Sequence, residues 1–326
     1  MNFKNIGSNK FLKTHFSLLA VLFVLIVILT ITCPNFGKVA NFAIIVRQLS
    51  LNVLVAMGMT VVLIGGGIDL SVGGVFAAAG IIAGLLMTKL GIPIWLLFVI
   101  AMAVGSIFGL ANGVLASFTN IPPFIITLGM SYVASGTAYV FGEGRSVSVI
   151  IKPFNNLGNG NVGIIPIPVF FMVTIAVILG VILSKTRLGR GIYATGSNVT
   201  AALYSGINIR KTRLFVYAVC GMLGAISATL NTAKVFVAQP DAGAGSEIDA
   251  IAAVVIGGTS FEGGKGTIFG TILGTLLITV IGNGMNQLGI TYFWQKIVKG
   301  IIIVLAVLVD ERMNVREKRR AMNAGK

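Results

Sequence analysis

Long apolar segments alternate with short polar ones along almost the whole chain. A helix needs about 20 apolar residues to cross a bilayer, and most of these segments come close to that length. We therefore predict an all-α, polytopic membrane protein with about ten transmembrane helices. Because 248–259 is too short to cross alone, eight or nine full spans with re-entrant pieces remain an alternative. The segments are 16–32, 42–64, 72–88, 94–118, 121–141, 167–184, 214–234, 248–259, 267–288 and 292–309.

The longest polar stretch between two apolar runs is 185–213, which carries six Lys or Arg and no Asp or Glu. The positive-inside rule places it in the cytoplasm, between the sixth and seventh spans. Asn198 is a suitable helix N-cap and Gly206 a suitable stop, so we predict a short helix over 199–205. Val199, Ala202 and Leu203 would form its apolar stripe and suit insertion into a partner's groove. The alternative is an ordinary basic loop.

Composition and charge support this topology. Of 326 residues, 56% are hydrophobic and 10% charged, with a mean hydropathy of +0.97, whereas soluble domains are about a quarter charged. Fifteen of the 24 Lys and Arg lie before residue 16, in 185–213 or after Val309. This placement puts both termini in the cytoplasm, so the net charge of +15 reflects topology and contact with anionic lipid, not nucleic acid binding. We expect a cytoplasmic N-terminus (1–15), one membrane domain (16–310) and a basic cytoplasmic tail (311–326).

The sequence offers little for metal or redox chemistry. Its two cysteines, Cys33 and Cys220, lie in or beside apolar runs without partner spacing, and its one histidine, His15, precedes the first span. We predict no disulfide, no metal site and no cofactor.

Glycine recurs at every fourth residue in two apolar segments, over 105–113 and over 266–274. This spacing places the glycines on one helix face and allows close helix packing. The surrounding letters also match (GSIFGLANG and GTIFGTILG), which suggests an inverted repeat. A competing match pairs VVLIGG, before Asp69, with AVVIGG, before Glu262.

Polar side chains inside the apolar segments mark a possible solute path. GGGIDLSVGG holds Asp69 and Ser71 between glycines, as a gate or as a brace at a helix terminus, where Ser71 would cap the following helix. Amides could line a path or join helices. Beyond Asp69 no chain of intramembrane carboxylates is present, which argues against proton coupling. The amide candidates for the path are Asn52, Asn283, Asn286 and Gln287, and Arg145 and Lys152 of the outer loop are candidates for docking a soluble partner.

The segment GGTSFEGGKGT resembles a phosphate-binding loop only superficially. That motif needs Gly, four residues, Gly-Lys and then Ser or Thr. Here Thr259 replaces the first glycine and Gly266 follows Lys265. We therefore expect neither ATP binding nor catalysis by this chain.

Several long motifs, in order, resemble the permease subunits of bacterial ATP-binding-cassette importers of the ribose type, a monosaccharide class that includes galactose, xylose and allose systems. The resemblance extends from about residue 17 to Asp310. Its motifs are PNF, GGIDLSVG, KTRLGRGIYATGSNVTAALYSGI, AQPDAGAGSEIDAIAAVVIGGTSFEGGKGTIFGT, NGMNQLG and VKGIIIVLAVLVD.

This resemblance implies a homodimeric permease in the plasma membrane that binds a separate cytoplasmic ATPase and receives sugar from an extracytoplasmic binding protein. A secondary, ion-coupled carrier and a cassette exporter are the alternatives. The tail after Asp310 is longer and more basic than is typical of the family. The residues to which the resemblance assigns coupling to the ATPase are Gly189, Asn198, Ala201, Ala202, Ser205, Gly206 and Ile207.

Overall fold

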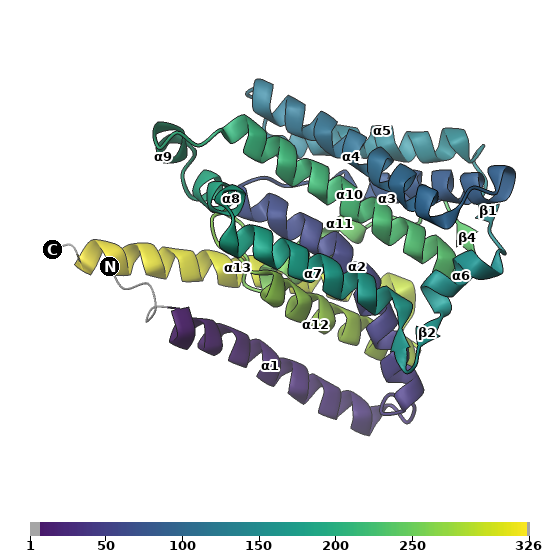
Figure 1. The fold of residues 1–326 in the computed structure, drawn as a ribbon. Helices are drawn as coiled ribbons and strands as arrows, with labels where there is room; N and C mark the ends of the chain where they lie inside the picture. Colours follow the sequence, from purple (N-terminus) through teal and green to yellow (C-terminus); the bar gives the residue numbers. More distant parts are fainter. Residues whose placement is uncertain (1–6, 325–326) are drawn as a thin grey trace.

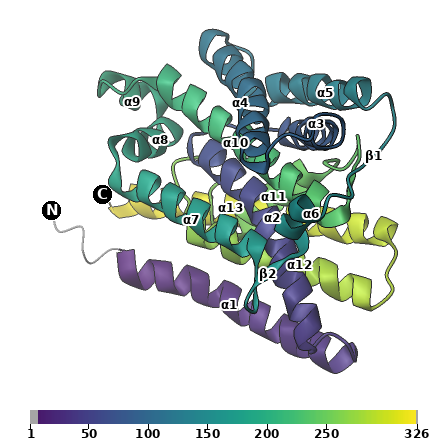
Figure 2. The same cartoon turned by 45° about the vertical axis from the view of Figure 1, so that its right-hand side comes forward.

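The computed structural model describes the backbone of residues 7–324 and the side chains of 16–308, 311 and 312. Most of this part is helical, and the long helices lie side by side in one bundle (Figures 1 and 2). The helices are α1 (Gly7–Thr32), α2 (Val39–Ile64), α3 (Val72–Leu85) continued by the π-helical turn η1 (Leu86–Leu90), α4 (Ile94–Phe118), α5 (Pro123–Phe141), α6 (Lys152–Asn159), α7 (Ile167–Lys185), α8 (Arg187–Ser197), α9 (Val199–Tyr204), α10 (Ile209–Val235), α11 (Ser246–Ile256), α12 (Ile268–Gln287) and α13 (Tyr292–Ala324).

The predicted all-α, polytopic class is confirmed, but the predicted count of about ten spans is not. In the described part, seven helices are long and apolar enough to cross a membrane: α2, α3 with η1, α4, α5, α7, α10 and α12. The apolar stretch of α1, Phe16–Thr32, is shorter. Helix α11 has 11 residues, which at 1.5 Å per residue is about 16 Å. It therefore reaches only about half of a hydrocarbon core of about 30 Å.

A non-helical segment, 239–245, leads into α11; Pro240 and Gly243 are buried in it, whereas residues 239, 241, 242 and 244 are exposed. Strand β4 (Val237–Ala238), just before it, pairs antiparallel with β1 (Val147–Ser148). Gly243 then touches the backbone of Gly73 at the start of α3, where a Cβ on either residue would overlap the other's carbonyl or a neighbouring side chain. Such backbone is tolerated at membrane depth only when protein or a water-filled cavity receives its polar groups. The segment 248–259, which the sequence marked as too short to cross alone, thus holds no full spanning helix.

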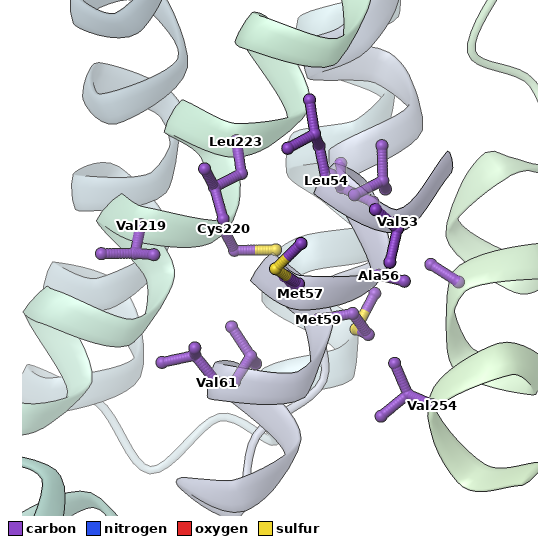
Figure 3. Packing of buried hydrophobic residues seen from close by; sticks show 14 of the residues in the cluster. Val53, Leu54, Ala56, Met57, Met59, Val61, Val219, Cys220, Leu223 and Val254 are labelled. Atoms are coloured by element: carbon purple, nitrogen blue, oxygen red, sulfur yellow. The ribbon is translucent and has the colours of Figure 1, made fainter. Parts of the chain in front are cut away.

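Helix α2 lies at the centre of the bundle, and its second half is almost completely buried. Figure 3 shows Cys220 of α10 pointing toward Met57 of α2, with Val254 of α11 on the other side. A Cβ on Gly58 would lie 2.9 Å from the Cα atom of Cys220, so the two backbones nearly touch. Helices α4, α5 and α7, by contrast, are buried over only about a fifth of their apolar windows, which leaves broad faces for lipid or partners.

The two glycine stripes pack helices together as the spacing predicts, except that Gly266, expected on the same helix face, precedes α12 and lies in the α11–α12 loop. Gly105, Gly109 and Gly113 of α4 each meet the backbone of α10, while Gly270 and Gly274 of α12 meet the backbone of α11. Both contacts lie within one chain. Close packing of helices therefore accounts for the stripes.

The two ends of the bundle differ. Helices α8 and α9 lie at one end, and α6, β1, β4 and the hairpin of β2 (Asn161–Val162) and β3 (Ile165–Pro166) lie at the other (Figure 1). Helix α1 begins and helix α13 ends at the α9 end (Figures 1 and 2). Residues 7–15 and 311–324, expected as flanking segments, continue these helices; residues 1–6 and 325–326 lie outside the described part.

Candidate functional site

The polar segment between α7 and α10 folds as a pair of short helices, α8 and α9. Asn198 caps α9, because its Oδ1 accepts a hydrogen bond from the Ala201 N–H at 2.9 Å. Gly206 has φ +77°, and the N–H groups of Gly206 and Ile207 donate to the carbonyls of Leu203 and Ala202, both at 3.0 Å. This is a Schellman end. The predicted start and stop of the short helix are thus confirmed, with the helix ending at Tyr204.

One face of α9 carries apolar side chains into solvent. Leu203 is 60% and Tyr204 87% exposed, and Val199 is 43% exposed. Ala202 is only 3% exposed, so its methyl group packs inward. Of the small residues expected to dock, Ala201 and Ser205 are exposed, and the Ser205 hydroxyl donates to the Ala201 carbonyl at 2.9 Å. The exposed apolar residues, not Ala202, form the surface that a partner can contact; we call Val199, Leu203 and Tyr204 the α9 face.

Gly189 holds α8 against the end of α7. A Cβ there would overlap the carbonyls of Ile182 and Leu183, and the Gly189 N–H donates to the Thr186 hydroxyl oxygen at 3.1 Å. The role of Gly189 is therefore to set the angle between α7 and α8. Gly189 lies in α8 and is therefore not part of the α9 face, but the angle that it sets helps to position that face.

Two basic residues of this segment fasten it to the end of α4. Arg213 donates from Nη1 to the Ala116 carbonyl at 2.6 Å, and the Arg210 guanidinium lies 4.6 Å from the centre of the Phe118 ring. Their charge suits a cytoplasmic surface, as the sequence indicated, but these two side chains also bind carbonyl and aromatic groups of the bundle. That contact could not be read from charge alone.

Two loops meet the C-terminal end of α8, where Gly66 of the α2–α3 loop, Gly196 of α8 and Gly263 of the α11–α12 loop touch; we call this the glycine junction. A Cβ on Gly66 would lie 3.2 Å from the Gly196 Cα, and one on Gly263 would lie 3.0 Å from the Gly66 Cα and 2.9 Å from the Gly196 carbonyl oxygen. The Gly264 N–H donates to the Ile64 carbonyl at 2.9 Å. The junction therefore joins the end of α8 to the α2–α3 loop and to the α11–α12 loop.

A side-chain bond strengthens the junction. The Tyr193 hydroxyl of α8 donates to the Gly266 carbonyl at 2.8 Å. Burial raises the pKa of this hydroxyl above its ordinary value, so it remains a proton donor at neutral pH. Movement of α8 must consequently move both loops or break these contacts.

Helices α2 and α11 end in the same way where they reach the junction. Gly66 donates to Leu63 at 2.9 Å and Gly67 to Val62 at 3.0 Å. In α11, 192 positions later, the N–H groups of 258 and 259 donate to the carbonyls of 255 and 254 at 2.9 and 3.1 Å. The competing sequence match, VVLIGG with AVVIGG, therefore has a structural counterpart in two matching Schellman ends.

A cavity of about 240 Å³ lies between α2, α10, α11, α12 and α13. Two of the predicted path residues, Asn52 and Asn286, line it. Asp69, Ser71, Asn283 and Gln287 do not belong to its wall. Its polar lining consists of Gln48, Asn52, Ser227, Asn231, Ser246, Asp249, Thr275, Thr279, Asn286, Gln295 and Lys299.

Asp69 is fully buried in a separate polar cluster between the α2–α3 loop and α4. Its Oδ1 accepts from the Ser71 N–H at 2.9 Å, from the Ser71 hydroxyl at 2.6 Å and from the Asn112 amide at 3.3 Å. The Ser71 hydroxyl thus serves Asp69 and makes no capping bond to α3, so that part of the prediction is wrong. The Ser71 hydroxyl oxygen instead accepts a hydrogen bond from the Asn112 amide at 2.8 Å, whereas a cap would accept from a backbone N–H of α3. The geometry is that of a brace at the start of α3.

Asn283 and Gln287 join helices. Asn41 and Asn283 exchange two hydrogen bonds of 3.0 Å, and the Gln287 amide donates to the Asn41 oxygen at 3.1 Å. This reciprocal amide pair ties α12 to the start of α2. Both residues act as interhelical hydrogen-bond partners, the alternative to a path role that the sequence left open.

The cavity also contains a charge pair that the sequence did not indicate. Lys299 of α13 donates to Asp249 of α11 at 2.6 Å. Residues 299 and 249 lie 50 positions apart, and only the packing of α11 against α13 brings them together.

At the end opposite α9, the segment 142–166, which the sequence predicts to lie outside, packs as a cover on the bundle. Phe154 and Asn155 of α6 are buried, and the Asn155 amide donates to the carbonyls of Val149 and Ala233 at 2.9 and 3.1 Å. Arg145 and Lys152, the candidates for docking a soluble partner, are both exposed on it. The cover presents their charges at fixed positions.

Within the described residues, no three His, Cys, Asp or Glu side chains lie close enough together to hold a metal ion. A bundle of apolar helices that encloses a polar cavity and carries a protruding helix pair at one end defines a multi-pass membrane transport protein.

Comparison with known proteins places the chain within that class. A family model described as branched-chain amino acid transport system / permease component matches residues 41–307. The chain is 38% identical over 317 residues to the ribose import permease protein RbsC of Haemophilus influenzae, covering 96% of this chain and 98% of the relative. It is 40% identical over 302 residues to RbsC of Escherichia coli K12, covering 91% and 93%. It is 38% identical over 270 residues to the D-allose transport system permease protein AlsC of E. coli K12, covering 83% of each chain.

The chain belongs to this family of transport-system permease components, and it is a multi-pass inner-membrane protein. No solved structure matches it significantly.

Proposed function

We propose that this chain is the transmembrane permease subunit of an ATP-driven importer that takes a monosaccharide, such as ribose, from an extracytoplasmic binding protein. The names of its relatives, two ribose import permeases and an allose permease, support the substrate class. The chain itself catalyses no reaction, and a separate cytoplasmic ATPase supplies the energy.

The observation that carries this proposal is the α9 face. A helix capped at both ends presents Leu203 and Tyr204 to solvent beside six basic residues. Exposed apolar side chains on a short, rigid helix suit a groove on a partner protein. In this proposal the α9 end faces the cytoplasm, both termini lie there, and the groove belongs to the ATPase.

The glycine junction supplies a route from the ATPase to the cavity. When ATP-driven closure moves α8 and α9, the junction passes that movement to the loops that lead into α3 and α12. Helix α12 lines the cavity with Thr275, Thr279 and Asn286, so its movement changes which side the cavity faces. The Asp69 brace keeps the start of α3 rigid during this motion. The resulting cycle is alternating access.

The remaining partners follow from the same model. A second copy of the chain completes the membrane part, as the family resemblance implies. Arg145 and Lys152 of the outer cover receive the sugar-binding protein through rim charges. The basic α9 end also contacts anionic lipid headgroups.

A charge-insertion pair tests the docking role. Leu203→Asp places a carboxylate on the α9 face, and Ile164→Asp places one at the opposite end on a residue that is 95% exposed. Both variants should fold, because neither side chain is buried. We expect Leu203→Asp to lose co-purification of the ATPase and sugar uptake, while Ile164→Asp retains the ATPase. Normal ATPase binding by Leu203→Asp would overturn the proposed docking surface.

A further inference from the structure

The polar residues that line the central cavity follow a regular pattern along the helices. Four of the surrounding helices each contribute two of them, spaced four residues apart, which places both on the same helix face. The pairs are Gln48 and Asn52 on α2, Ser227 and Asn231 on α10, Thr275 and Thr279 on α12, and Gln295 and Lys299 on α13. The cavity is therefore bounded by four polar helix faces that converge, and not by isolated polar residues.

Three of these side chains have unused hydrogen-bonding capacity. The side-chain amides of Gln48, Asn52 and Asn231 form no hydrogen bond with any other residue whose side chain the structure describes. By contrast, Asn41 and Asn283 each donate one hydrogen bond to the other. Each amide offers two donors and an acceptor. Inside a membrane such groups need a polar partner, because an unsatisfied amide in an apolar medium costs several kcal/mol. A polar solute or water must satisfy them.

The charge pair completes the chemistry of the wall. Lys299 and Asp249 neutralise each other; both line the cavity, and their side chains are 25% and 39% exposed. Only Oδ2 of Asp249 accepts the lysine, which leaves Oδ1 open to a hydroxyl donor. Bonds to a carboxylate are about twice as strong as those between neutral groups. With the two charges balanced, the cavity suits a neutral solute better than an ion.

Part of the wall is apolar. Leu51, Val55 and Phe76 lie beside the polar groups. Such a wall combines apolar side chains with polar groups that fix the orientation of a ligand. It would accept the C–H face of a ring whose hydroxyl groups point to the amides.

We propose that this cavity is a binding site for a neutral polyhydroxylated solute of monosaccharide size, with Asp249, Asn52 and Asn231 as its hydrogen-bonding residues. The proposal rests on the import function proposed above and adds to it that the permease itself holds the sugar during passage. Asn52 and Asn231 bind hydroxyl groups of the solute. Asp249 accepts a further hydroxyl proton, and its pairing with Lys299 favours a neutral solute over an ion.

The first experiment measures D-ribose uptake and ATP hydrolysis in proteoliposomes that contain the chain with its ATPase and binding protein. Asn231→Leu removes the amide at nearly constant size, and Asn120→Leu makes the same change at an exposed amide of the α4–α5 loop, outside the cavity. We expect Asn231→Leu to lower uptake by about tenfold, the effect of losing one or two hydrogen bonds. ATP hydrolysis stimulated by the loaded binding protein should persist, and Asn120→Leu should transport normally.

The second experiment measures occupancy without transport. Asn52→Cys places a thiol in the cavity wall, while the native Cys33 and Cys220 are buried. D-Ribose should slow the labelling of this thiol by a small maleimide in the assembled complex, and an equal concentration of sodium chloride should not. This readout decides the question if Asn231→Leu fails to fold.

The outcomes separate the two proposals. If the wild-type complex shows no ATP-dependent uptake, the importer function itself is wrong. If the wild type imports D-ribose, Asn231→Leu does so at the same rate and D-ribose leaves the Asn52→Cys labelling rate unchanged, the cavity is not the sugar site and only this inference falls.

Discussion

The glycine junction makes a sharp prediction for Gly196→Ala. The added methyl group would lie 2.7 Å from the Gly264 N–H nitrogen and would overlap the Ile64 carbonyl oxygen. Both neighbours are backbone atoms, so neither can rotate away as a side chain would. The substitution must therefore separate α8 from the two loops or displace them.

The size of the effect follows from two terms. Overpacking by one methyl group costs about 1–3 kcal/mol, and loss of the hydrogen bond between Gly264 and Ile64 costs about 1 kcal/mol more. Together these are about 2–4 kcal/mol, which shifts the equilibrium of the closed junction by about 30- to 1000-fold. If the junction transmits motion, uptake should fall by at least about tenfold.

The assay follows uptake and ATP hydrolysis in parallel in reconstituted complexes. We expect Gly196→Ala to bind the ATPase, because the α9 face is untouched, and to hydrolyse ATP without importing sugar. Gly191→Ala is the matched control on the same helix, since its Cβ would meet only the Ile207 Cγ2 at 3.5 Å and the Thr212 hydroxyl at 3.7 Å. Wild-type uptake by Gly196→Ala would refute the coupling role of the junction.

Three further substitutions test neighbouring contacts. Tyr193→Phe removes only the bond to Gly266 and should lower uptake a few-fold through loss of about 1 kcal/mol, whereas unchanged uptake would leave the bond incidental. Asn198→Ala should weaken ATPase binding by destabilising α9 by about 1 kcal/mol, and Asn198→Asp, which keeps the acceptor, should not; equal affinities in a pull-down titration would contradict this. Asp69→Asn weakens a buried brace and should lower the thermal stability of the purified protein by about 1–3 kcal/mol; unchanged melting and uptake would make Asp69 dispensable.

Features set by a few consecutive residues could be predicted from the sequence. Helix α9 is one, because Asn198 and Gly206 fix its two ends by local hydrogen bonds and backbone conformation. The packing role of the glycine stripes is another, since spacing alone places them on one face. The inward direction of Ala202 is different, because it depends on how α9 lies against the bundle.

Features that depend on the register between helices could not be predicted. The pairing of Lys299 with Asp249 depends on how α11 packs against α13, which no local pattern reveals. The same holds for Gly66, Gly196 and Gly263, whose contact joins the end of α8 to two loops far apart in the chain. For Asn52 and Asn286, the sequence named the residues but not the cavity that they share.

The central claim is that a separate ATPase drives solute through this chain. The most direct test is D-ribose flux into sealed proteoliposomes, with the chain alone and with its ATPase and binding protein present. The account predicts flux only when both partners and ATP are supplied, and none with a non-hydrolysable nucleotide. Sustained D-ribose accumulation by the chain alone, driven by an ion gradient, would contradict it.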